Sequence, residues 1–199
     1  RIMERRTYLH DLNARLITER LDGDHQRATL TFYTDELIYD IRNIAYIYGV
    51  AKSDKQPDVD NHLTFDIGEE GNVDRIARVL DLSFSEIQEA LYPYTRSPLL
   101  EDQGCGCEIH QRDDILDTER EEYTLNMIVP SLMSRHTLTY AENWIHEFLV
   151  CRAFAEWLML IGDSSFNVWL EKAEIAKKEI MRAMARRTGK IRRKMSPFV

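Results

Sequence analysis

The clearest alternation of apolar and polar positions lies in the last third of the chain. Across residues 140–161 apolar side chains recur every three or four positions, which is the spacing of one helix face. Thr139 and Glu142 have the spacing of a capping box at its start, and Gly162 is expected to end it. A second helix is predicted from residue 166 to about residue 187, so that the two form an antiparallel helical hairpin. Asp163 or Ser164 is expected to start the second helix. The predicted apolar stripe of the first helix holds Trp144, Ile145, Phe148, Leu149, Ala153, Trp157, Leu158 and Ile161, and that of the second holds Val168, Trp169, Ala173, Ala176, Ile180 and Ala183.

Another helix is predicted between residues 34 and 49. Its apolar positions recur at i, i+4, i+7, i+8 and i+11, with Thr34 or Asp35 as the cap and Gly49 as the C-terminal end. Tyrosines are spread around this segment, which indicates contact with a partner as well as with the core. The apolar positions are Leu37, Ile41, Ile44, Ala45 and Tyr48, and the tyrosines are Tyr33, Tyr39, Tyr46 and Tyr48.

Two short helices are predicted between residues 72 and 93. Ser83 and Glu86 form a second capping box, which is expected to start the second of these helices, and Pro93 is expected to stop it. The pair has the outline of a helix-turn-helix, but its turn has no glycine. Glu86 and Glu89 face outward from the second helix, where acids oppose the phosphate attraction on which DNA affinity depends. This helix is therefore not expected to read DNA.

Alternating patterns predict one or two short strands. Over residues 123–129 apolar side chains take every second position until Pro130 ends the run. A shorter alternation lies at residues 62–67. Residues 4–22 are ambiguous and fit helical spacing, and residues 94–119 form the longest predicted loop.

These patterns together predict a mainly α protein. It is expected to be a helical bundle with a C-terminal antiparallel helical hairpin, one or two short β-strands and an extended basic C-terminal arm. Residues 1–181 are predicted to form a single mainly helical domain, with a possible sub-boundary in the loop at 94–119. Residues 182–199 form the predicted arm.

Charge is divided unevenly along the chain. The 199 residues include 26 bases and 34 acids, for a formal net charge of −8. Residues 182–199 hold seven of the bases and no acid, which leaves 19 bases against 34 acids, a charge of −15, before residue 182. Because blocks of like charge tend to project and bind in trans, this division is typical of a docking arm. The plainer alternative is a solvated, frayed helix end.

Candidate chemistry is sparse. Cys105, Cys107, His110 and Asp113 are close in sequence, but a zinc site usually takes two separated ligand pairs, and no second pair follows. The chain has no glycine-rich phosphate loop, no Gly-x-Ser-x-Gly elbow and no His-Glu-x-x-His motif. We therefore expect no enzymatic activity, no metal and no cofactor.

Cysteine usage and hydropathy bear on the compartment. Three cysteines are an odd number, which favours a reducing environment over a disulfide framework. The apolar runs are too short to span a bilayer, and the first residues hold bases without the apolar stretch of a secretory signal. We expect no membrane partner.

Four segments of the C-terminal part carry a resemblance to a known group. They are Glu142–Val150 (ENWIHEFLV), Ala155–Leu158 (AEWL), Trp169–Glu174 (WLEKAE) and Arg192–Phe198 (RRKMSPF). In this order, over roughly residues 120–199, the chain resembles head–tail connector or neck-ring structural proteins of tailed phages and prophages of Bacteroidetes.

The resemblance implies a role in virion assembly. Such adaptors are small helical bundles arranged as rings beneath the portal, whose C-terminal segments reach into the adjoining ring. It implies as partners further copies of this chain in a homo-oligomeric ring, the portal or adjacent neck and tail proteins, and non-specific contact with packaged DNA. The location implied is the virion, assembled in the cytoplasm of the bacterial host. The partner-binding residues expected from the arm are Arg186, Arg187, Lys190, Arg192, Arg193, Lys194, Met195, Pro197 and Phe198.

The alternative hypothesis is a regulatory protein associated with nucleic acid. It would use the helices at residues 72–93 together with the basic arm. The oligomeric state and the affinity for duplex DNA at physiological salt separate the two hypotheses.

Overall fold

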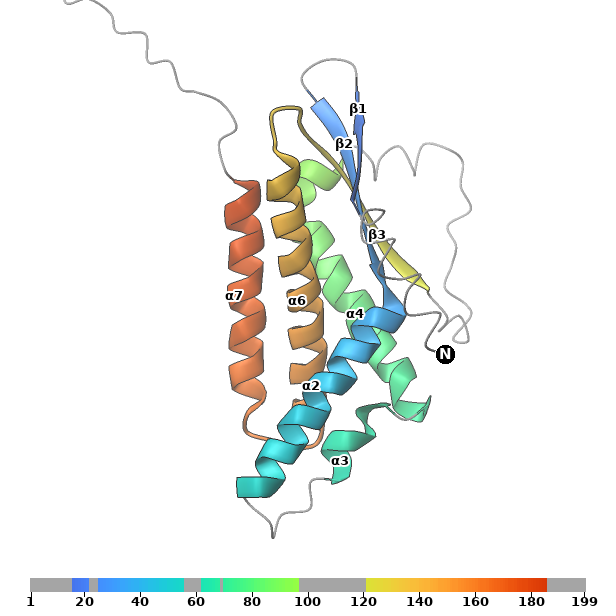
Figure 1. Ribbon diagram of the computed structural model, residues 1–199, viewed down its shortest axis with the longest axis vertical. Coiled ribbons are helices and arrows are strands. Elements are labelled where there is room, and N and C mark those ends of the chain that lie inside the picture. Colours follow the sequence, from blue (N-terminus) through green and yellow to red (C-terminus); the bar gives the residue numbers. More distant parts are fainter. Residues whose placement is uncertain (1–15, 22–24, 56–61, 69, 97–120, 186–199) are drawn as a thin grey trace, which may run out of the picture.

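The computed structural model describes residues 16–21, 25–55, 62–68, 70–96 and 121–185, and a three-stranded sheet lies to one side of its long helices (Figure 1). This part of the chain is mainly helical. Its elements in chain order are β1 (Leu16–Arg20), β2 (His25–Tyr33), α2 (Thr34–Lys55), α3 (His62–Phe65), the 3-10 turn η2 (Asp66–Gly68), α4 (Glu70–Ala90), β3 (Glu122–Pro130), α6 (Arg135–Leu160) and α7 (Phe166–Met184).

The sheet is antiparallel, with β2 between β1 and β3. Leu30 of β2 pairs with Leu16 of β1 and with Leu125 of β3. One face of the sheet is buried against the helices, whereas on the other Thr29 donates a hydrogen bond of 2.9 Å to Asn126. The buried side chains are Ala28, Leu30 and Phe32 of β2 and Tyr123, Leu125, Met127 and Val129 of β3.

The prediction for β3 is confirmed, and the other two strands are corrections. Residues 4–22 fitted helical spacing, but residues 16–20 form an edge strand in which Leu16 is buried and Ile17 is exposed. Pairing with β2 outweighs the helical spacing there. β2 was not anticipated, although its apolar residues alternate as those of β3 do. Residues 1–15 lie outside the described residues.

α6 is the central helix of the fold. Apolar side chains are buried on nearly every side of it, because it packs against α7, α4 and α2. α7 lies beside α6 and runs in the opposite direction after a short turn (Figure 1), so the predicted C-terminal pair of contacting helices is confirmed. Three alanines on α7 allow the close approach, and the side chains buried there are Ala173, Ala176, Ile180, Ala183 and Met184.

The start of α6 differs from the prediction. The helix begins at Arg135, and its cap is Ser134, whose hydroxyl accepts a 3.2 Å hydrogen bond from the backbone N–H of Thr137. The capping box at Thr139 and Glu142 was therefore wrong, and Glu142 is a buried position within the helix. An upstream serine takes the capping role and adds a turn to the helix.

The end of α6 agrees with the prediction. Gly162 follows the helix with φ of +74°, the left-handed conformation that only glycine adopts at little cost. The next helix begins at Phe166.

The predicted strand at residues 62–67 is a helical turn. Thr64 and Ile67, three residues apart, are both buried, as the inner side of α3 and η2 requires. Phe65 packs beneath α2 at Gly49, where an added Cβ would lie 2.7 Å from two atoms of the ring. Gly49 therefore does not end α2 as predicted, because its missing side chain makes room for Phe65 while the helix continues to Lys55.

The two short helices predicted at residues 72–93 are one continuous helix, α4. The Ser83 hydroxyl donates a 2.7 Å hydrogen bond to the carbonyl of Val79, which is the bond that serine makes inside a helix. The capping box at Ser83 and Glu86 is therefore wrong, and the helix-turn-helix outline is lost with it. None of the helices described has the length and apolar content needed to cross a membrane.

Candidate functional site

The residues expected to bind partners lie outside the described part of the chain. They are Arg186, Arg187, Lys190, Arg192, Arg193, Lys194, Met195, Pro197 and Phe198. The residues considered as metal ligands also lie outside it, and these are Cys105, Cys107, His110 and Asp113. Within the described ranges, no three His, Cys, Asp or Glu side chains are grouped so as to hold a metal ion. Arg182, Ala183 and Met184 belong to α7, and the last two are buried, so the removable part of the arm begins at residue 186.

α2 is the element that presents a candidate interaction surface. Its buried inner face sets the orientation of the helix on the protein core. Leu37, Ile41 and Ala45 are buried against the core at the spacing that the sequence predicted. Tyr48 continues this face, where its ring meets the ring of Phe154 edge-on with centroids 5.7 Å apart. The opposite face of α2 must therefore point away from the protein.

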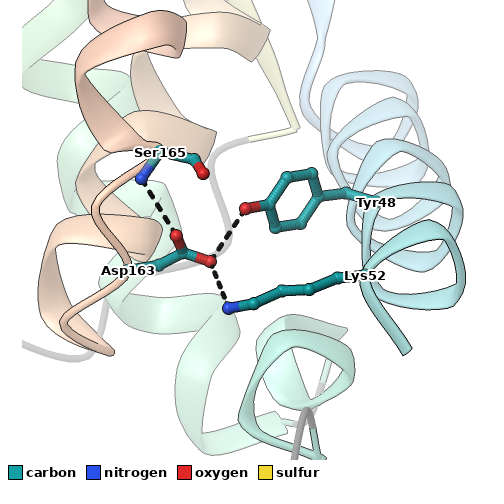
Figure 2. A network of polar contacts seen from close by, with 4 residues as sticks. All are labelled: Tyr48, Lys52, Asp163 and Ser165. Carbon is teal, nitrogen blue, oxygen red and sulfur yellow. Dashed lines mark hydrogen bonds and ion pairs between the residues drawn. The ribbon is translucent and has the colours of Figure 1, made fainter. Parts of the chain in front are cut away.

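A polar network joins α2 to the turn between α6 and α7 (Figure 2). Oδ2 of Asp163 accepts hydrogen bonds from the Tyr48 hydroxyl at 2.9 Å and from Nζ of Lys52 at 2.8 Å. Oδ1 of the same carboxylate accepts from the backbone N–H of Ser165 at 2.9 Å. Only 5% of the Asp163 side chain is exposed, so this ion pair is shielded from solvent far more than a surface pair.

The network changes the pKa values of its members. Burial alone would raise the pKa of Asp163, but the hydrogen bonds from Lys52, Ser165 and Tyr48 outweigh burial and lower its pKa to about 2. Burial and the adjacent Asp163 carboxylate raise the pKa of Tyr48. At neutral pH the network therefore holds a carboxylate, an ammonium and a neutral phenol, which is a stable arrangement for a structural contact.

The exposed side of α2 carries large apolar side chains at helical spacing. Tyr46 is 62% exposed and Ile47 is 59% exposed, and Tyr39 and Val50 are also exposed. Phe65 of α3 extends the group, since its ring centroid lies 6.0 Å from that of Tyr46. We call Tyr39, Tyr46, Ile47, Val50 and Phe65 the α2 surface. Exposed groups of this kind, rich in tyrosine, are typical of protein–protein contacts.

Acidic side chains lie at the N-terminal end of the α2 surface. Asp35 and Glu36 occupy the first turn of α2, and Asp40 follows one turn later. Oδ2 of Asp40 lies 2.8 Å from Nε2 of His146 on α6. Along the exposed side of α2, acids at its N-terminal end are thus followed by exposed Arg42 and Asn43 and then by the apolar C-terminal end.

A small open cleft adjoins this acidic end. It has a volume of about 220 Å³ and lies where the end of β2, the start of α2 and the middle of α6 meet. Its lining residues are Phe32, Glu36, Glu142, Asn143 and His146. The carboxylates in this lining suit a basic group of a partner better than an anion.

Cys151 is buried within α6, and burial together with the nearby Glu147 raises its pKa to about 12. The thiol donates a hydrogen bond to Oε1 of Glu147 at 3.4 Å. It is therefore a protonated core residue at neutral pH and no nucleophile.

Comparison with protein-family models, with curated proteins and with solved structures gave no match.

Sequence reasoning found part of this site. Tyrosines on more than one side of the 34–49 segment indicated partner contact, and Tyr39 and Tyr46 are indeed exposed while Tyr48 faces the core. The network at Asp163 was missed, because the sequence marked that residue only as a possible start of α7. Its partners lie more than one hundred positions away, and no local pattern predicts such a pairing.

Proposed function

We propose that this chain is a structural virion protein, a subunit of a head–tail connector or neck ring that joins portal and tail. Its partners are further copies of the chain, the portal or adjacent neck and tail proteins, and it assembles through residues 182–199. The observation that supports this proposal most is the α2 surface, where Tyr46 and Ile47 are each more than half exposed.

The distribution of charge supports the same proposal. A body of charge −15 and an arm of seven bases attract each other, so contact between basic and acidic parts is favourable. In a ring, each arm meets the acidic body of a neighbour, which sets the register between copies. The resemblance of residues 120–199 to neck proteins, through the segments ENWIHEFLV and RRKMSPF, points in this direction as well.

Association with nucleic acid is the second candidate, and the basic arm is the feature that favours it. Its weakness is α4, which forms one continuous helix with Asp81, Glu86 and Glu89 along its length. A helix with these acids opposes the phosphate backbone. Contact between the arm and packaged DNA is compatible with the ring, since phosphate contacts need no sequence reading.

Sedimentation velocity on the full chain and on a variant that lacks residues 186–199 tests the proposal. The full chain is expected to form oligomers that weaken as salt rises, because opposite charges hold them together. The shortened variant keeps the buried Ala183 and Met184, so it should still unfold in one cooperative transition while association is lost.

Duplex DNA binding is measured on the same samples. A full chain that stays monomeric at all concentrations and binds duplex DNA tightly at physiological salt would overturn the proposal in favour of the second candidate. Weak binding that vanishes at moderate salt agrees with a ring subunit.

A further inference from the structure

We infer that the α2 surface is the receptor for residues 186–199 of a neighbouring copy of this chain. This inference rests on the proposed function, because it requires that copies of the chain associate. It assigns the acceptor side of the contact, which lies entirely within the described residues.

The order of charge along the two partners is complementary. The arm has six bases between Arg186 and Lys194, followed by the apolar segment Met195–Val199. The exposed side of α2 has three acids at Asp35, Glu36 and Asp40, then one base at Arg42, and then the apolar side chains of Tyr46, Ile47 and Val50. An arm that runs along α2 from its N-terminal to its C-terminal end therefore meets acids with bases and apolar groups with apolar groups.

The lengths also agree. From Asp35 to Val50 the surface covers fifteen helical steps, which at about 1.5 Å each is about 22 Å. The fourteen residues 186–199 span at most about 46 Å when extended, so they can cover the surface and leave several residues to cross between copies.

A neighbouring copy is a better source for the arm than the same copy. The turn at Asp163 contacts Tyr48 and Lys52, so the apolar half of the α2 surface lies near that end of the α6–α7 pair (Figures 1 and 2). α7 ends at Met184, nineteen residues or about 28 Å along the helix from that turn. To reach the apolar end, a chain's own arm must retrace this length, which takes up more than half of the at most about 46 Å that the arm can span, at an entropic cost.

The outer face of α7 also carries exposed apolar side chains, and it suits a basic arm less well. Val168 and Ile175 are exposed there, but lysines at 172 and 178 lie among them together with glutamates. Lys172 and Lys178 balance Glu171 and Glu174 here, whereas the acids on the exposed side of α2 outnumber Arg42, so the α7 face offers no net attraction to six bases. It therefore provides a matched control for changes on α2.

Photo-crosslinking identifies what covers the surface. The full chain carries p-benzoylphenylalanine in place of Tyr46, in a mixture of unlabelled and ¹⁵N-labelled copies at a concentration where it associates. Crosslinked peptides that join position 46 of one isotopic form to residues 186–199 of the other are the expected product. Crosslinks to the arm within a single copy, or to any other part of a second copy, would overturn the inference.

Paired substitutions give an independent readout. Tyr46→Ser with Ile47→Ser is expected to weaken self-association at least about tenfold, as for interface anchors, while Val168→Ser with Ile175→Ser leaves it unchanged. All four side chains are exposed, so both variants should fold. Equal effects of the two pairs would contradict the assignment.

Charge reversal tests whether the contact forms in trans. Asp35→Lys with Asp40→Lys on the surface, and Arg192→Glu with Arg193→Glu on the arm, should each prevent self-association. Mixing the two variants should restore it, because each arm then finds a surface of opposite charge on the other variant. No recovery on mixing would refute the pairing.

The outcomes separate the inference from the function on which it rests. A full chain that never associates contradicts the proposed function. A chain that associates normally with the α2 substitutions contradicts only the choice of surface.

Discussion

Asp163→Asn removes the charge that ties α2 to the turn between α6 and α7 and keeps the shape of the side chain. The carboxylate accepts three hydrogen bonds, two of them from Tyr48 and Lys52 on α2. The amide retains an acceptor oxygen but loses the ion pair. Its NH2 group, which is a hydrogen-bond donor, then lies near the donor group of Lys52 or Ser165. We expect the variant to fold, with a lower free energy of unfolding.

The pKa of Asp163 gives the magnitude. It falls from 3.8 to about 2 on folding, and at about 1.4 kcal/mol for each pH unit this corresponds to about 2 kcal/mol. For a chain of this length the unfolding midpoint should fall by roughly 4–8 °C. Glu156→Gln is the control, because its ion pair with Arg152 is a partly exposed one within α6, worth about 0.5 kcal/mol or less.

The assay is urea unfolding of the parent chain and of both variants between pH 7 and pH 2. Because folding lowers the pKa of Asp163, its stabilisation is complete above about pH 5 and is lost as pH falls toward 2. The parent should therefore exceed Asp163→Asn by about 2 kcal/mol at pH 7, and the difference should shrink through this window. The raised pKa of Tyr48 keeps its phenol neutral over this range.

A cost below about 0.5 kcal/mol at pH 7, or a cost that does not change with pH, would refute the reasoning. A direct NMR titration of the Asp163 carboxyl supplies the second check. Its midpoint should lie near 2 in the parent and rise in Lys52→Gln, which removes the strongest lowering contact.

Three further predictions concern the core. Gly49→Ala should destabilise the protein by about 1–3 kcal/mol in urea unfolding, because the new Cβ meets the Phe65 ring at 2.7 Å. Gly71→Ala is its control: a Cβ at Gly71 meets nothing within 4 Å, so this variant should be neutral or stabilising in the same assay. Phe154→Ala should cost about 3–5 kcal/mol by the same assay, since the ring is fully buried, and a cost under 1 kcal/mol would contradict its place in the core. Cys151 should react with a thiol reagent only on unfolding, as peptide mass spectrometry would show. Rapid labelling of Cys151 itself in the native chain would disprove its burial.

The sequence was most informative where one local pattern decides the structure. The stripe through Ile145, Phe148 and Leu149 predicted α6, and the alternation from Tyr123 to Val129 predicted β3, because each follows the period of its own element. Both elements were found with small errors at their ends.

The errors arose where a distant contact decides the structure. Gly49 has the usual features of a helix end, but Phe65, sixteen residues later, packs on it and the helix continues. Ser83 has the spacing of a helix start, but within α4 its hydroxyl bonds back to Val79. The strand Leu16–Arg20 exists because β2 pairs with it, which no local period reveals.

The candidate site, too, was predictable from the sequence only in the part that a local pattern decides. The tyrosines of α2 could be read as contact residues, because a helix with aromatic side chains on opposite sides cannot bury them all in one core. Which of them face outward depends on where α6 and the turn at Asp163 lie, and the acidic-to-apolar order of the exposed side emerges only once that face is known.

The two proposals share α2 as the rigid element. Its inner side is held by Leu37, Ile41 and the network at Asp163, so Tyr46 and Ile47 are presented on a helix that does not need to reorganise on binding. Pre-organised contact residues lower the entropic cost of association. Asp163→Asn should consequently weaken self-association as well as stability.

Native mass spectrometry of the full chain over a range of concentrations tests the central claim most directly. A ring closes at one stoichiometry, so we predict a single discrete oligomer that persists on dilution until it falls directly to monomer, and that is absent when residues 186–199 are removed. A monomer at every concentration, or an open-ended ladder of oligomers that survives removal of the arm, would contradict the account.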